Sequence, residues 1–356
     1  MTISVRRMAI LGWLLFTLCM FANRGSAQGV DAMRWTMEGR KLSPEAAAGL
    51  ELQVKAAPGD VEARTRLLGY YMQRAFSSPE ARAARQQHIL WLIRNRPDAA
   101  VLDTPFARLD RIMDGSAYED GKKAWLEQVE RQPQDAALLG RAAGYLQLHD
   151  SAMAEDLYRR AEAAEPQNAQ WSAELGHLYQ RGISRETGEV RETKAKAALA
   201  AYEQSLQRVK EEEVVDRRSL LSDAARMALE VGDLAKASGY ADELLASVDE
   251  RSGDWMTGNA IHQGHLILGR IALRGHDLAQ AKEHLLAAGR TPGSPQLNSF
   301  GPNMSLAKEL LEAGERQAVL DYLKLCGSFW KRGELEAWSK EIQAGKIPDF
   351  GANLEY

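Results

Sequence analysis

Apolar residues recur along most of the chain with the spacing of amphipathic helices that are paired into hairpins. The clearest stretch runs from 135 to 166, where two apolar helical faces are separated by a polar turn at 149–150. Pro166 ends the second helix because proline lacks an N–H and clashes with the preceding turn. The apolar positions of this hairpin are Leu138, Ala142 and Tyr145 in the first helix and Ala154, Tyr158 and Ala161 in the second.

The same arrangement recurs four more times towards the C-terminus. A small residue in the first helix precedes its counterpart in the second by 12 residues in four of the five hairpins, and by 22 in the other. Such a fixed distance indicates a repeat architecture. The pairs are Ala142 and Ala154, Gly176 and Ala198, Ala225 and Ala237, Gly269 and Ala281, and Ala307 and Val319.

Helix-capping residues independently predict the same hairpins. An acidic residue lies four positions before the small residue of the second helix, where it favours a helix N-terminus. A glycine often precedes it, at a position where the first helix needs a left-handed exit. The acids are Asp150, Asp233, Asp277 and Glu315, and the glycines are Gly232, Gly275 and Gly314.

These positions resemble the signature of the tetratricopeptide repeat. Its small, aromatic and proline positions are occupied by Ala142, Tyr145, Ala154, Tyr158, Ala161 and Pro166, and Leu138 stands where the family often has Trp. The resemblance implies an all-α fold, a right-handed α-solenoid of antiparallel helix hairpins. It also implies a scaffold that binds a protein or peptide in its concave groove.

Outside residues 135–326, which hold these repeats, the pattern loosens. Residues 55–134 predict degenerate hairpins, in one of which Phe106, Leu109 and Ile112 belong to a first helix. Residues 28–54 are predicted to be a tail or cap, and residues 327–356 a capping helix followed by a polar tail. Within the repeats, charged residues and glycines predict a solvated loop at 181–194. Prolines and glycines predict an ordered, non-helical loop at 291–303.

Residues 1–27 have the order of a secretory signal peptide. Arg6 and Arg7 precede an apolar run that ends at Ala22, and small residues at 25–27 suit cleavage. The run is shorter than the about 20 apolar residues that span a membrane, and an uncleaved anchor is the alternative. We expect a periplasmic or secreted protein, with no stable membrane insertion after cleavage.

Composition and net charge indicate which class of binding partner to expect. With 45% hydrophobic and 26% charged residues, the chain has enough apolar material for a core. Cleavage would remove three arginines and change the net charge from −4 to −7 (−4 − 3). A mildly acidic surface argues against nucleic acid, which needs concentrated basic charge, so we expect a protein or peptide partner. Cys326 would be the only cysteine left, so no internal disulfide is expected.

The resemblance also implies which residues line the concave groove. The ninth repeat position faces the groove in the family, and here it falls at Ala143, His177, Arg226, Arg270 and Lys308. The last four form a basic ladder that we expect to receive carboxylates of an extended partner. The alternative is an ordinary solvated face, in which nearby acids such as Asp223 and Glu174 pair with the ladder.

Nothing in the sequence points to a reaction. No nucleotide loop, nucleophile elbow or zinc-protease motif is present, and we expect no enzyme activity and no cofactor. A helical-toroid glycan hydrolase with paired carboxylates is the alternative. No metal site is expected either, because no cysteine accompanies the four histidines that we considered as ligands. These are His262, His265, His276 and His284.

Overall fold

The structure, a computed structural model, describes residues 27–210, 214–249, 254, 256–332 and 334–354. The chain forms two compact units, Met1–Pro166 and Gln167–Tyr356, and each is described by itself. The predicted signal peptide lies outside the described residues, apart from Ala27. Within the described ranges there is no strand, and no helix is long and apolar enough to cross a membrane.

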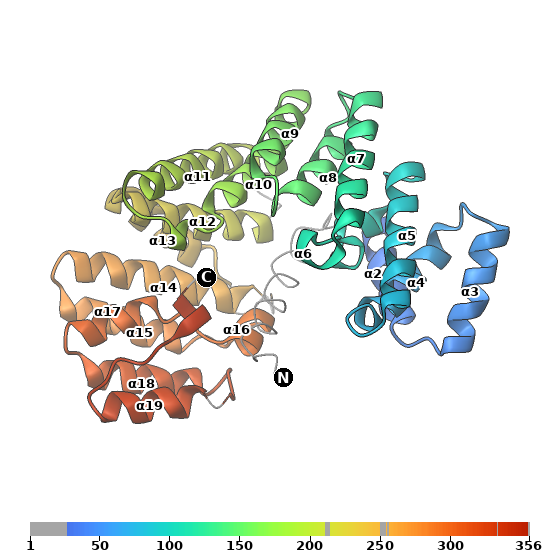
Figure 1. Cartoon of the computed structure of the whole chain (residues 1–356). Helices are drawn as coiled ribbons and strands as arrows, with labels where there is room; N and C mark the ends of the chain where they lie inside the picture. Colours follow the sequence, from blue (N-terminus) through green and yellow to red (C-terminus); the bar gives the residue numbers. More distant parts are fainter. Residues whose placement is uncertain (1–26, 211–213, 250–253, 255, 333, 355–356) are drawn as a thin grey trace. The chain divides into compact units, whose positions relative to one another are not determined.

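The N-terminal unit consists of helices joined by short turns (Figure 1). Its elements are α2 (Ala27–Gly39), α3 (Pro44–Ala56), α4 (Val61–Arg74), α5 (Pro79–Asn95), η1 (Ala100–Asp103), η2 (Pro105–Ala107), α6 (Arg111–Asp114), α7 (Ser116–Arg131), α8 (Ala136–Leu146) and α9 (Ser151–Ala164).

The C-terminal unit continues the hairpins and ends in a shorter helix and a folded tail. Its elements are α10 (Ala169–Gln180), η3 (Ile183–Arg185), α11 (Gly188–Arg208), α12 (Val214–Val231), α13 (Leu234–Ala246), α14 (Thr257–Arg274), α15 (Leu278–Gly289), α16 (Pro295–Phe300), α17 (Ser305–Glu312), α18 (Arg316–Cys326), α19 (Glu334–Gln343) and η4 (Gly351–Leu354).

Most consecutive helices pack against each other within each unit, which confirms the predicted all-α solenoid of tetratricopeptide-like hairpins. The small residues that define the hairpins are buried as expected: Ala154, Ala237 and Ala281 have no exposed surface. In the expanded hairpin, a Cβ on Gly176 would lie 2.6 Å from the ring of Tyr202. Small residues therefore let the two helices of a hairpin approach closely, which is why the 12-residue distance persists.

Two of the four predicted acidic caps form the expected bond. The Asp233 carboxylate accepts from the backbone N–H of Lys236 at 3.1 Å, and that of Asp277 accepts from Gln280 at 2.9 Å. Each satisfies a backbone donor that the first turn of a helix leaves without a partner.

The other two acids are bound elsewhere. The Asp150 carboxylate accepts from the Tyr118 hydroxyl at 2.7 Å and from the Lys122 ammonium at 2.5 Å, both on α7. The Glu315 carboxylate pairs with Lys282 of α15 at 3.0 Å. Both occupy the N-cap position without a side-chain cap bond. The predicted capping role is wrong for them, because a cation on a neighbouring helix binds the carboxylate instead.

This difference gives a stability prediction. Replacing Asp277 with Ala removes a cap bond, and we expect the free energy of unfolding of the C-terminal unit to fall by about 1 kcal/mol. Replacing Glu315 with Ala removes only a partly exposed ion pair, and we expect a loss below about 0.5 kcal/mol. Urea denaturation of both variants measures the two values, and equal losses would contradict the cap assignment.

The helix exits follow the prediction at two of three glycines. Gly232 and Gly314 have φ of 83° and 91°, in the left-handed region. Gly275 has φ of −80°, and the next residue, His276, takes the left-handed conformation with φ of 61°. The predicted exit is therefore displaced by one residue in this turn.

The expansion at 181–194, predicted as a loop, is largely helical. A short 3-10 turn at 183–185 is followed by α11, which begins at Gly188 and extends the second helix of the hairpin. Lys194 pairs with Glu186, which ties the start of this helix to the turn before it. The sequence gives no apolar periodicity there because the extension is mostly exposed.

Residues 100–114, predicted to contain the first helix of a hairpin, form short helical segments instead. Phe106 and Leu109 lie in or beside short 3-10 turns rather than in a long first helix, and Leu109 is buried. Ile112 does not pack into the core, since it is 88% exposed on the four-residue helix α6. Pro105 and Gly115 interrupt the chain on either side, so the apolar spacing of this stretch does not reflect one continuous helix.

Three segments hold more regular structure than predicted: residues 28–54, predicted as a tail or cap, the loop at 291–303, predicted as ordered but non-helical, and the tail after α19. Residues 28–54 hold α2 and α3, and α2 packs on α4. The loop at 291–303 contains α16, which starts with Pro295 in the first turn, where proline is favoured. The tail after α19 folds back: Phe350 is buried, and the Asn353 side chain donates to Phe300 O at 3.0 Å and Pro302 O at 2.8 Å.

Candidate functional site

The predicted ladder residues lie on the first helices of successive hairpins in the C-terminal unit. His177 is on α10, Arg226 on α12, Arg270 on α14 and Lys308 on α17. α12 packs against α14, and α14 against α17, which brings these helices together. Ala143, the fifth ninth-position residue, is fully buried in the N-terminal unit. We call the surface of His177, Asp223, Arg226, Arg270, Lys308 and Glu309 the first-helix face.

A carboxylate connects the first two ladder residues. Asp223 on α12 lies 3.4 Å from His177 Nε2 and accepts from Arg226 Nη2 at 2.8 Å. Burial alone would raise the pKa of Asp223, but the His177 hydrogen bond and the Arg226 charge outweigh it and lower the pKa. The His177 ring also packs edge-on against Tyr202, with centroids 5.4 Å apart. Asp223 is therefore ionised and holds both ladder residues.

The third and fourth ladder residues also have acidic neighbours. Arg270 donates to one Glu309 oxygen from Nε at 2.9 Å and from Nη2 at 2.6 Å, which joins α14 to α17. Lys308 lies 4.0 Å from Glu312, one turn further along α17. The Arg270 and Glu309 side chains remain 23% and 31% exposed, so the pair is accessible to a partner.

Two more arginines connect neighbouring helices to α12. Arg191 on α11 pairs with Glu230 on α12, and this bond lowers the pKa of Glu230. Arg274 on α14 donates to Leu229 O of α12 at 2.5 Å. Glu230 and Arg274 were not singled out from the sequence, although Glu230 lies one helical turn after Arg226 on the same helix.

The ladder is thus a surface of paired charges rather than a basic stripe. Asp223, which the sequence offered as a neutralising neighbour, does pair with two ladder residues. Groups of both signs lie on α12 and on α17, and Arg270 of α14 pairs with Glu309 of α17. Such a surface complements a partner that carries both signs of charge.

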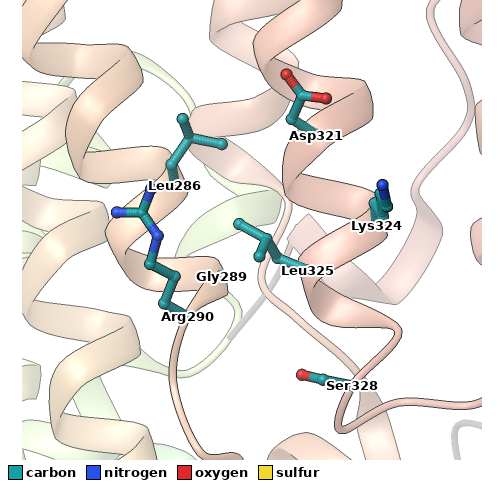
Figure 2. A pocket seen from close by; sticks show the side chains of 7 residues that line it. All are labelled: Leu286, Gly289, Arg290, Asp321, Lys324, Leu325 and Ser328. Atoms are coloured by element: carbon teal, nitrogen blue, oxygen red, sulfur yellow. The ribbon is translucent and has the colours of Figure 1, made fainter.

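A separate groove lies between the second helices α15 and α18 (Figure 2). It is open, with a volume of about 660 Å³, and Figure 2 shows Leu325 and Ser328 projecting from the α18 side towards α15. Arg290 and Lys324 line it, and neither pairs with an acid within the described ranges. Its lining residues are Leu286, Gly289, Arg290, Asp321, Lys324, Leu325 and Ser328.

The histidines that the sequence raised as ligands occupy different environments. His262 is fully buried, with Nδ1 3.1 Å from Ala288 O and Nε2 3.1 Å from Asn303 N, so both nitrogens are engaged. His276 lies in an exposed turn. Among the residues that can be placed, no group of three or more His, Cys, Asp or Glu is arranged around a common metal position.

Comparisons with known proteins include a likeness to a solved structure. The chain is similar to a solved structure of a monomeric mutant of IFIT1 with Gppp-AAAA, at 17% sequence identity and a TM-score of 0.49. The match covers 95% of this chain and 75% of that chain. No family model matches the chain, and no curated protein sequence matches it.

This comparison corrects the sequence-based exclusion of nucleic acid. That exclusion is withdrawn: net charge alone does not exclude nucleic acid, and the similar structure was solved with Gppp-AAAA. The physical cause of the error is that net charge averages over the whole surface, whereas nucleic-acid binding depends on local basic charge.

Proposed function

We propose that this chain is a binding scaffold of the cell envelope or secreted space, and that it holds an extended protein segment across the first-helix face. The observation that carries the proposal is the set of partly exposed ion pairs on adjacent first helices, represented by Arg270 with Glu309. The export-type segment at residues 1–27 supports the location.

Fixed ion pairs favour such binding because their side chains are already ordered. A partner that meets them loses less conformational entropy on association than one that must order free side chains. The presence of both signs on this face selects a segment with both acidic and basic residues, since a like charge opposite any of them is repelled. Binding of this kind involves no chemical step.

A charge swap tests the first-helix face without removing its ion pair. In the double variant Arg270→Glu with Glu309→Arg, the pair between α14 and α17 is retained with its polarity reversed. We expect peptides selected from a random display library on the wild-type protein to bind this variant about tenfold more weakly. Fluorescence anisotropy of the labelled peptides measures the difference.

The matched control is the swap Lys282→Glu with Glu315→Arg on the second helices, where a pair of similar exposure is reversed. It should leave peptide affinity unchanged. Equal affinities of wild type and the first-helix swap would refute the proposed surface. Recovery of no peptide, together with binding of Gppp-AAAA, would replace the protein partner with a nucleic-acid one.

A further inference from the structure

Two histidines outside the first-helix face approach each other within one hairpin. His265 on α14 and His284 on α15 have their Nδ1 atoms 3.2 Å apart, and their ring centroids lie 5.4 Å apart at an interplanar angle of 35°. Both rings are partly buried. The sequence separates these residues by 19 positions, so their contact follows from the pairing of the two helices.

Both imidazoles are suited to metal ligation at neutral pH. Burial lowers the pKa of His265, and the neighbouring His284 lowers it further. Burial also lowers the pKa of His284. The neutral form is therefore favoured in each ring, and only the neutral form offers a nitrogen lone pair to a metal.

The distance fits a tetrahedral ion. Zinc–nitrogen bonds of about 2.0–2.1 Å at a tetrahedral angle place two ligand nitrogens about 3.3 Å apart. The observed 3.2 Å between the two Nδ1 atoms is close to this value. A direct N–H···N hydrogen bond has a similar length, so it is the alternative that an experiment must separate from metal binding.

Two carboxylates act on His284 through their charge. Asp242 on α13 and Glu283 on α15 both raise the pKa of His284 through their charge. Both side chains are exposed, and the Asp242 carboxylate accepts a hydrogen bond from the Ser238 hydroxyl at 3.2 Å. Neither belongs to a preformed three-ligand group, so a bound ion would rely on two imidazoles and would recruit water or one carboxylate.

We propose that His265 and His284 form a Zn²⁺-binding pair within the α14–α15 hairpin, completed by water or by the carboxylate of Asp242 or Glu283. The open positions leave room for exchange with solvent, in contrast to a closed structural zinc site. This inference is independent of the proposed partner on the first-helix face, because it concerns the contact between a first and a second helix.

The test is a zinc titration of the purified full chain, prepared without a polyhistidine tag and freed of metal with a chelator. Isothermal titration calorimetry should show one Zn²⁺ per chain, and Co²⁺ should give the intense visible absorption of a tetrahedral site. We expect His265→Asn and His284→Asn each to weaken zinc binding by at least about tenfold. His276→Asn, in the exposed turn, is the matched control and should bind like wild type.

Either of two results would overturn the proposal. One is the absence of zinc binding to the wild-type chain. The other is zinc binding that persists when His265→Asn and His284→Asn are combined, which would leave the histidines as a hydrogen-bonded pair only. If the variants do not fold, NMR of the wild-type chain decides the matter. Zinc must then shift the imidazole resonances of His265 and His284, and unchanged resonances would refute the site.

Discussion

Replacing Gly69 with Ala should destabilise the N-terminal unit by about 3 kcal/mol, whereas the same change at Gly49 should stabilise it by up to about 1 kcal/mol. Both glycines lie inside helices, Gly69 in α4 and Gly49 in α3. A Cβ at Gly69 would lie 2.0 Å from the backbone oxygen of Thr36 in α2. A Cβ at Gly49 would meet nothing within 4 Å.

The sign of each effect follows from what surrounds the new methyl group. Alanine is a better helix former than glycine by about 1 kcal/mol, and at Gly49 this preference acts alone. At Gly69 the clash is with backbone, which cannot rotate away as a side chain can. α2 must therefore move off α4, and the buried contacts of Ala32 and Thr36 are lost.

Urea denaturation measures both free energies of unfolding, and hydrogen exchange of the α2 amides reports whether that helix stays docked. Gly39→Ala provides an independent check from the other helix, since its Cβ would lie 1.9 Å from the backbone oxygen of Arg66. It should expose α2 in the same way. A Gly69→Ala variant as stable as Gly49→Ala would show that α2 does not pack on α4 at this distance.

The hairpins were predictable because their requirement is local and repeated. Positions such as Ala237 and Ala281 must be small wherever two helices of a hairpin touch, and both are fully buried. The contact between α2 and α4 was missed for the opposite reason. It is made by backbone at Gly39 and Gly69, so it adds few large apolar residues to the periodic pattern of α2.

The candidate site was predictable in its positions but not in its bonds. Repeat spacing predicted Arg226 and Arg270 on successive first helices, and the structure has them on α12 and α14. The acid that Arg270 binds, Glu309, is 39 residues away on the next first helix. Which of several acids lies within reach depends on how adjacent hairpins pack, and a single sequence carries no direct signal of that packing.

Acidification should destabilise the C-terminal unit through His262, by up to about 3 kcal/mol. Burial, the main cause, lowers the pKa of His262 from 6.5 to about 4. Its Nδ1–H donates to Ala288 O, and its Nε2 accepts from the N–H of Asn303. A proton on Nε2 would face that N–H and abolish the bond between α14 and the segment before α17.

The sign follows from proton binding in the two states. Between about pH 4 and pH 6.5, the unfolded chain binds a proton at this residue and the folded chain does not, so stability rises with pH. The full contribution is present above the unfolded pKa of about 6.5 and is lost as the pH falls through the folded value of about 4. Unperturbed carboxylates ionise at about pH 4, so a variant must isolate the histidine.

His262→Gln is the discriminating variant, because an amide keeps a donor and an acceptor but does not titrate in this range. We expect it to be less stable than wild type at pH 7.5, and the difference to shrink steadily between pH 6.5 and pH 4. Urea denaturation at several pH values, in buffer with a metal chelator, measures both curves. Parallel curves would show that His262 does not link folding to protonation. If the variant does not fold, NMR titration of the wild-type imidazole gives the folded pKa directly, and a value near 6.5 would contradict the prediction.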